Sequence, residues 1–225
     1  MSSTLDEGFD KILTKIEEQE PNSAITALQT LTWLYYAQQP LLMTQLLEAL
    51  EIGDNDRHLG AIENTAANII DCSLSFVAHD QSTGDVRFIH PSVQRWFDCE
   101  PQHAKLLSQS YLANTCLTCL NFDEFDTFIK TKYEIEFERV SDKFYSYAAQ
   151  FWGDHARVVE ESLEIQKRVL TFLRSENKKN FMLLVATNGQ FHLYRDGQTV
   201  LHVLARNGIG SLCQILLKFD EWYTL

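Results

Sequence analysis

In the first half of the chain, two short runs of alternating apolar residues interrupt an apolar spacing that is otherwise that of helices. Residues 74–78 and 86–88 place an apolar side chain at every second position, and a loop containing Gly84 joins the two runs. Period-2 runs joined by such a loop predict a β-hairpin. Pro91 and Ser92 follow closely and suit the first turn of another helix. A small hairpin set between helices therefore restricts the first half of the chain to a few mixed folds.

The residues before the hairpin have helical spacing. Residues 5–16 predict a first helix, which Pro21 breaks, and Ser23 is the expected N-cap of a second. Two more helices are expected at about residues 44–53 and 59–72. Three helices followed by a two-stranded wing are the plan of a winged-helix domain.

We expect this winged helix at residues 23–99, after an N-terminal helix or connector at residues 1–22. Winged helices often bind DNA through their third helix, so the charge of this region matters. Residues 1–100 hold 16 acidic and 5 basic side chains, so that 11 of the 12 net negative charges of the chain lie there. The third helix of the domain, residues 59–72, carries no Lys or Arg to face phosphates. We therefore expect no nucleic acid partner, and an acidic surface that anionic membranes repel.

The second half of the chain is expected to form a helical bundle at residues 100–180. Its apolar spacing predicts helices at residues 104–120, 144–159 and 163–173. The polar residues 175–180 are interpreted as a linker. Between Tyr133 and Glu138 aromatic or aliphatic residues alternate strictly with Glu, which predicts either a strand or an extended connector laid over the helices.

The last part of the chain has Thr and His at the start of a short helix, Gly at its end and paired Leu in a second helix. The residues that match this pattern are Thr199, Leu201, His202, Ala205, Gly208, Leu216 and Leu217. The pattern is that of an ankyrin-type repeat, with Val200 in place of the usual Pro. We expect the Thr and His to hydrogen-bond across the turn and the Gly to be left-handed. Residues 181–225 would form a single, incomplete repeat that docks on the bundle or continues a stack.

Four stretches, taken in order, resemble the central part of fungal NACHT–ankyrin proteins, which belong to the STAND class of signalling ATPases and NOD-like receptors. They are residues 31–47, 86–97, 103–120 and 147–156. The first two look like the winged-helix domain that is also named for GPI inositol-deacylase. The resemblance implies a mainly α fold, a cytoplasmic location and protein partners, including an upstream NACHT ATPase module.

The same resemblance implies a role for His90. In STAND proteins a His at the end of the winged-helix strand can reach the diphosphate bound on the neighbouring module and hold the off state. His90 stands at this position, between the second run of the hairpin and Pro91. The alternative, from the residues alone, is that His90 caps the helix that follows it.

Nothing in the sequence predicts a catalytic residue, a cofactor or a metal. The chain has no Gly-x-x-x-x-Gly-Lys-Ser/Thr loop, no Gly-x-Ser-x-Gly and no His-Glu-x-x-His. Cys116 and Cys119 have metal-site spacing, but they lie on an apolar helical face without a second pair, which favours buried structural thiols. Five scattered cysteines and the lack of a long apolar run favour a reduced compartment without a membrane span.

The sequence therefore predicts a non-catalytic regulatory and interaction segment of a NACHT-type signalling protein. In it, the winged helix would act as a switch and the ankyrin-type unit would begin a sensor. The alternative is a stand-alone, truncated adaptor or decoy that binds other proteins without any ATPase partner.

Overall fold

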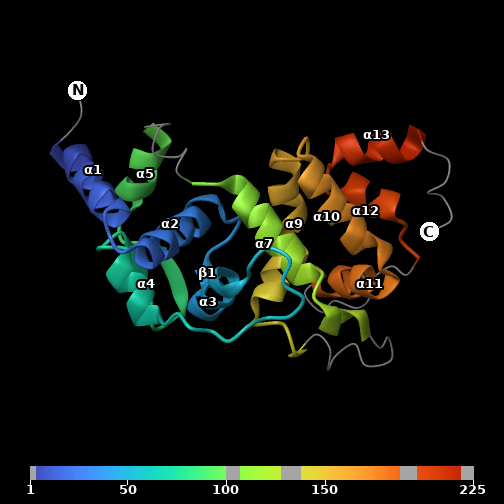
Figure 1. Ribbon diagram of the computed structural model, residues 1–225, viewed down its shortest axis with the longest axis horizontal. Helices are drawn as coiled ribbons and strands as arrows, with labels where there is room; N and C mark the ends of the chain where they lie inside the picture. The colour runs from blue at the N-terminus through green and yellow to red at the C-terminus, as the bar shows by residue number, and fades with distance from the viewer. Residues whose placement is uncertain (1–3, 100–106, 128–137, 188–196, 219–225) are drawn as a thin grey trace. The chain divides into compact units, whose positions relative to one another are not determined.

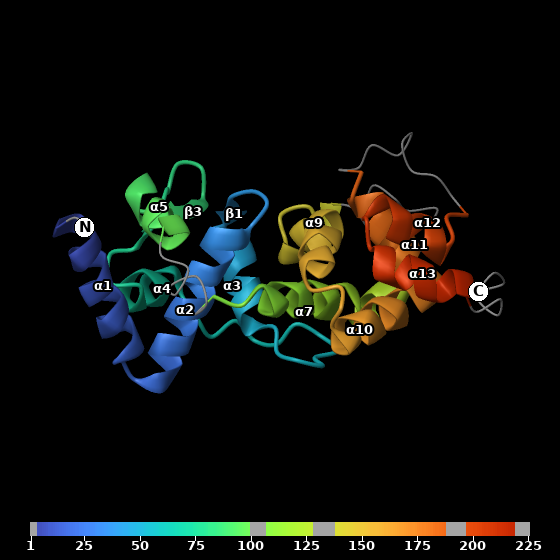
Figure 2. The ribbon, with the colours of Figure 1, turned by 90° about the horizontal axis from the view of Figure 1, so that it is seen from above.

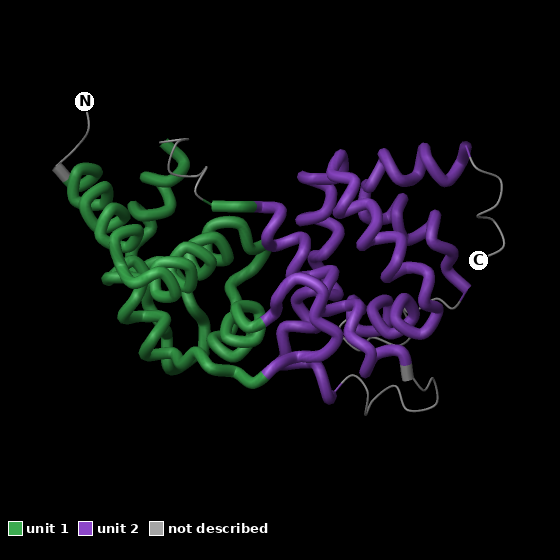
Figure 3. The backbone as a smooth tube through the Cα atoms, viewed as in Figure 1, with its two compact units in different colours: residues 1–51, 61–108 green, residues 52–60, 109–225 purple. Residues whose placement is uncertain are grey.

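The computed structural model describes residues 4–99, 107–127, 138–187 and 197–218 (Figure 1). The chain divides into two compact units, with residues 1–51 and 61–108 in unit 1 and residues 52–60 and 109–225 in unit 2 (Figure 3). The fold is mainly α with one small sheet, as the sequence predicts. No helix in the described ranges is both long and apolar enough to cross a membrane. The alternating segment that begins at Tyr133 lies outside the described residues, except for its last residue, Glu138.

Five helices build the described part of unit 1. They are α1 (Thr4–Glu17), α2 (Pro21–Tyr36), α3 (Met43–Glu51), α4 (Ala66–Cys72) and α5 (Pro91–Cys99). The expected N-cap at Ser23 is wrong, because α2 begins two residues earlier with Pro21 at its first position. Proline is favourable there because its missing N–H would have no partner in the helix. The carboxylate of Glu20 caps this end by accepting a hydrogen bond from the backbone N–H of Asn22 at 3.1 Å.

The helix expected from residue 59 is shorter than predicted. It begins at Ala66, where the Thr65 side chain accepts a hydrogen bond from the Asn68 N–H. Before it, the Glu51 carboxylate accepts hydrogen bonds from the backbone N–H groups of Glu63 and Asn64 at 3.0 and 2.9 Å. These N–H groups are satisfied without a helix, so the chain stays irregular up to the cap.

The predicted hairpin is confirmed, and a third strand joins it. β2 (Val77–His79) pairs antiparallel with β3 (Asp85–Phe88). Gly84, with a φ of +80°, takes the left-handed conformation that the turn between them requires. The two-residue strand β1 (Leu41–Leu42) pairs with the other edge of β3, so the order in the sheet is β1-β3-β2. The sequence analysis did not predict β1, because two residues are too short to show a period.

An aromatic cluster forms the core of unit 1. Phe9 of α1 lies 5.7 Å, between ring centroids, from both Phe76 and Trp96, and the rings of Trp96 and Phe97 are 4.8 Å apart. All four side chains are buried. Such offset and edge-on ring contacts stabilise beyond the area they bury. The helix expected as a separate connector at residues 1–22 thus contributes to the same core as α5.

All secondary-structure elements described in unit 2 are helices. Its elements are α7 (Gln109–Leu120), the 3-10 helix η1 (Asp123–Thr127), α9 (Phe144–Val158), α10 (Leu163–Arg174), α11 (Glu176–Val185), α12 (Val200–Arg206) and α13 (Gly210–Lys218). α9 lies against α7, and α11 packs on α9 (Figure 2).

The linker expected at residues 175–180 is wrong, because these residues begin α11. Ser175 ends α10 and is also the N-cap of α11, where its hydroxyl accepts a hydrogen bond from the Lys178 N–H. Lys178, Lys179 and Asn180 are buried. The polar composition suggested a loop, but long lysine side chains can bury their methylene stems when the ammonium group finds a partner.

A close approach between α9 and the end of α12 depends on Gly153. A Cβ added at this position would lie 2.1 Å from Oδ1 of Asn207. Asn207 is the residue that ends α12, and its Nδ2 donates to the Val203 carbonyl at 2.8 Å. Glycine in the middle of α9 is therefore what allows the last helix pair to pack on this helix.

Candidate functional site

His90 lies on the surface of unit 1, between β3 and α5. Its Nδ1 accepts a hydrogen bond from the backbone N–H of Ser92 at 3.1 Å and lies 2.7 Å from the Ser92 hydroxyl. The carbonyl of His90 accepts from the Val93 N–H at 3.0 Å. His90 therefore caps α5, as its alternative interpretation predicts.

The cap fixes which nitrogen of His90 is left for another partner. Because Nδ1 accepts from a backbone N–H, the neutral ring carries its proton on Nε2. Within the described part of the chain Nε2 has no hydrogen-bond partner. An exposed N–H donor thus stands at the end of the hairpin, on a ring that Ser92 orients.

A groove of about 530 Å³ runs beside His90 in unit 1. Ile89 and Pro91, the two neighbours of His90, both line it, and Ile89 is 56% exposed. Tyr35 lines it from the end of α2 and donates a hydrogen bond to Asp98 of α5 at 2.8 Å. Burial, together with the hydrogen bond to the Asp98 carboxylate, raises the pKa of Tyr35 to about 12. The phenol therefore stays protonated and ties α2 to α5.

The ankyrin-type motif residues surround the start and the end of α12 in unit 2. The Thr199 hydroxyl accepts from the His202 N–H at 3.4 Å, and Nδ1 of His202 accepts from the Thr199 N–H at 3.3 Å. These reciprocal bonds form a capping box. Gly208 has a φ of +67°, in the left-handed region. The expected hydrogen bonds and glycine conformation are thus present.

The apolar members of this motif differ in burial. Leu216 is buried and Leu201 half-buried, whereas Ala205 is exposed and Leu217 is 53% exposed. The motif therefore contributes to the packing of the α12–α13 pair and also leaves part of its apolar surface uncovered.

Cys116 and Cys119 are free, buried thiols on α7. Burial raises the pKa of the Cys116 thiol, so that it stays protonated and is a poor metal ligand or nucleophile. The described ranges contain no cluster of three or more His, Cys, Asp or Glu that could hold a metal ion.

Unit 2 also contains a groove of about 520 Å³ that the sequence analysis did not predict. We call it the cationic groove, since its lining includes Arg57, Lys167, Arg168 and Lys178 together with the acidic residues Asp56 and Asp123. Residues 57 and 167–178 are far apart in the sequence, so only the tertiary fold brings them together. The sequence of α10 gives a weak indication of the cationic groove, because residues 167, 168 and 171 lie on one helical face.

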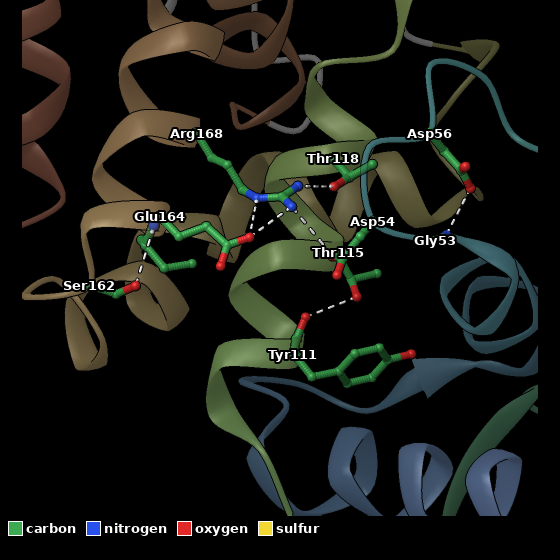
Figure 4. A network of polar contacts seen from close by, with 10 residues as sticks. Gly53, Asp54, Asp56, Tyr111, Thr115, Thr118, Ser162, Glu164 and Arg168 are labelled. Carbon is green, nitrogen blue, oxygen red and sulfur yellow. Dashed lines mark hydrogen bonds and ion pairs between the residues drawn. The ribbon is translucent and has the colours of Figure 1, made fainter.

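Arg168 is held by several polar contacts at this groove (Figure 4). Its Nη1 donates to the Thr118 hydroxyl at 3.1 Å, and its Nη2 lies 3.0 Å from the Glu164 carboxylate and 3.5 Å from that of Asp54. The Arg168 side chain is only 17% exposed, whereas that of Asp54 is 69% exposed. The guanidinium is thus held in a fixed orientation from α7 and α10.

Asp123 binds two further cations of the groove. Its carboxylate lies 2.6 Å from Nη2 of Arg57 and 3.7 Å from Nζ of the buried Lys178. The Lys178 ammonium also donates to the Asn121 carbonyl at 2.7 Å. The negative charge of Asp123 is therefore already compensated within the protein.

A buried imidazole lies elsewhere in unit 2. His155 is 3% exposed, and its Nε2 lies 2.8 Å from the hydroxyl of the fully buried Tyr147. Burial lowers the pKa of His155 to about 4. The ring is therefore neutral at physiological pH, and its visible role is to satisfy the Tyr147 hydroxyl inside the helical packing.

Comparisons of the chain with protein-family models, with curated proteins and with solved structures return no match.

Proposed function

We propose that this chain is a non-catalytic regulatory and interaction segment of a NACHT-type signalling protein. Residues 23–99 act as a winged-helix switch and packing element, and the ankyrin-type unit within residues 181–225 is the start of a sensor. The proposed location is cytoplasmic, and the proposed partners are proteins, among them an upstream NACHT ATPase module.

The observation that carries this proposal is the order of elements in unit 1. α2, β1, α3, α4, β2 and β3 follow one another, and β1 pairs with β3. A winged helix has this arrangement, with its first strand between the first two helices and paired with the last strand of the wing. The agreement of strand order, and not only of helix number, supports the winged-helix assignment.

His90 is the proposed switch residue. Its cap to α5 uses Nδ1, and the exposed Nε2–H remains as a donor. A diphosphate on a neighbouring module is a strong acceptor for such a donor. Because the two nitrogens have separate tasks, the capping role and the phosphate-sensing role are compatible.

The ankyrin-type proposal is supported by the capping box at Thr199 and by the left-handed Gly208. The exposed Leu217 adds to it, because a repeat presents apolar side chains to the next unit of a stack or to a partner.

A calorimetric titration of the chain with a cognate NACHT fragment, loaded with ADP or ATP, tests the proposal. His90→Ala removes both the cap and the Nε2 donor, whereas His90→Asn keeps a good N-cap through its Oδ1, and its amide is too short to place an N–H at the Nε2 position. We expect both variants to bind the ADP-loaded fragment about tenfold more weakly, the effect of one hydrogen bond to a charged group.

If the variants bind as tightly as the parent in both nucleotide states, His90 does not sense phosphate. Binding to a partner with no dependence on nucleotide would instead favour the stand-alone adaptor or decoy.

A further inference from the structure

We propose that the cationic groove of unit 2 binds a phosphate-bearing ligand through Lys167 and Arg168, and that the Asp54 carboxylate competes for the same position. This site is separate from the proposed switch at His90 and adds a small-ligand function to unit 2.

The groove has the size and the free donors of a binding site. Its volume of about 520 Å³ lies within the range of small-molecule sites. Lys167 and Thr171 line it one turn apart on α10, and both are exposed. Neither side chain has a hydrogen bond or an ion pair with another described residue. An ammonium and a hydroxyl group that face the same groove can both donate to a phosphate oxygen.

Arg168 provides the oriented cation beside them. Thr118 and Glu164 hold its guanidinium by contacts of 3.1 and 3.0 Å, while Asp54 lies at 3.5 Å. An ion pair with a mostly exposed carboxylate at this distance contributes little. A phosphate oxygen could therefore replace the carboxylate of Asp54, and the guanidinium would not need to reorient.

The acidic side chains that line the groove are already engaged. Asp123 is paired with Arg57 and Lys178, and the Asp56 carboxylate accepts a hydrogen bond from the Gly53 N–H at 2.8 Å. Glu164 stays paired with the Arg168 guanidinium at 3.0 Å, so Asp54, at 3.5 Å, is the acid that a ligand would displace.

The lining also limits the class of ligand. No aromatic ring lines the groove among the described residues, and hydroxyl and amide groups such as Thr171 and Asn121 do. Nucleobases are usually bound by stacking on aromatic rings. The ligand is therefore a compact anion recognised through its phosphates, either a free polyphosphate or the headgroup of a phosphorylated lipid.

Calorimetric titration of the full chain with tripolyphosphate, and flotation with vesicles containing phosphatidylinositol bisphosphate, test the proposal and separate the two sources. For whichever probe binds the parent, we expect Lys167→Ala to weaken binding about fivefold, the effect of one exposed charge-assisted contact. Asp54→Asn should strengthen it about twofold, since it removes the competing carboxylate.

Lys11→Ala is the matched control, because Lys11 is an exposed lysine within a helix of unit 1. It should bind like the parent. Helical circular dichroism of each variant shows that the fold is kept. Equal binding by the parent and Lys167→Ala overturns the proposal, as does the absence of binding to both probes at millimolar concentration. ATP binding tenfold or more tighter than tripolyphosphate would overturn recognition through phosphates alone.

Discussion

Unit 1 packs α1 and α5 through aromatic rings, whereas unit 2 buries a histidine and two lysines among its helices. The aromatic rings around Trp96 carry no charge, so they need no ion-pair partner at any pH. His155, Lys178 and Lys179 each need a hydrogen-bond partner or a neutral state, because an unpaired buried charge is strongly unfavourable. Packing between α1 and α5 should therefore depend on the shape of the rings alone, whereas packing around the buried cations and imidazole of unit 2 depends on solution conditions too.

The largest effect is expected from unit 1. Trp96→Ala removes a ring that is 3% exposed and contacts Phe9, Phe76 and Phe97. We expect unit 1 to lose about 4 kcal/mol of stability, as for other buried aromatic truncations. Urea denaturation followed by circular dichroism measures this loss. Ile89→Ala, at an exposed position, is the control, and a similar loss there would contradict a core-specific effect.

The pH dependence of unit 2 comes next. The pKa of His155 is lowered from 6.5 to about 4, so the unfolded chain binds the proton more readily. The contribution of the neutral ring is complete above about pH 6.5, and about 3 kcal/mol is lost as the pH falls towards 4. Thermal unfolding between pH 7 and pH 4 measures it.

His155→Gln keeps a hydrogen-bonding partner for the Tyr147 hydroxyl and removes the titration. The variant should lose less stability over this pH range than the parent. Identical pH profiles would mean that His155 does not determine the sensitivity of unit 2.

Gly153 offers a smaller test of the packing in unit 2. The Cβ of Gly153→Ala would collide with Asn207, and we expect a loss of about 2 kcal/mol through the forced displacement. Gly8→Ala in α1 is the matched change, since nothing lies within 4 Å of its added Cβ. Gly8→Ala should stabilise the protein by about 0.5–1 kcal/mol, because alanine has a higher helix propensity than glycine. Denaturation midpoints that shift in the same direction for both variants would refute the steric explanation.

The smallest effect is expected at the capping box. Thr199→Ala removes the hydroxyl that caps α12 and should cost about 1 kcal/mol. Thr199→Ser keeps the hydroxyl and should retain most of the stability that the cap contributes. Hydrogen exchange of the α12 amides measures the difference, and equal protection in both variants would show that the cap does not stabilise this helix.

The sequence predicts those elements whose signal is local. The hairpin, α5 and α10 follow from the spacing of their apolar residues, and the actual helices begin within a residue of expectation at Pro91 and Leu163. Their boundaries are set by neighbouring residues, such as the Pro at the start of α5. For the same reason the bonds of the Thr199 and His202 box could be expected from a four-residue motif.

What the sequence cannot predict depends on distant partners. α11 was interpreted as a linker because Lys178 and Lys179 look like surface residues, and the Asn121 carbonyl that accepts from Lys178 is 57 positions away. β1 exists only through its pairing with β3. The cationic groove has the same origin, since Arg57 and Arg168 become neighbours only through the fold.

Ser175 both ends α10 and starts α11, so the joint between these helices has no spare residue. One residue inserted after it would turn α11 by about 100° about its axis and shift it by about 1.5 Å. Lys178 would then leave Asn121 and Asp123, and Phe181 would leave the core. Evolution can change the side chains around this joint, but it has little freedom to change the length of the chain there.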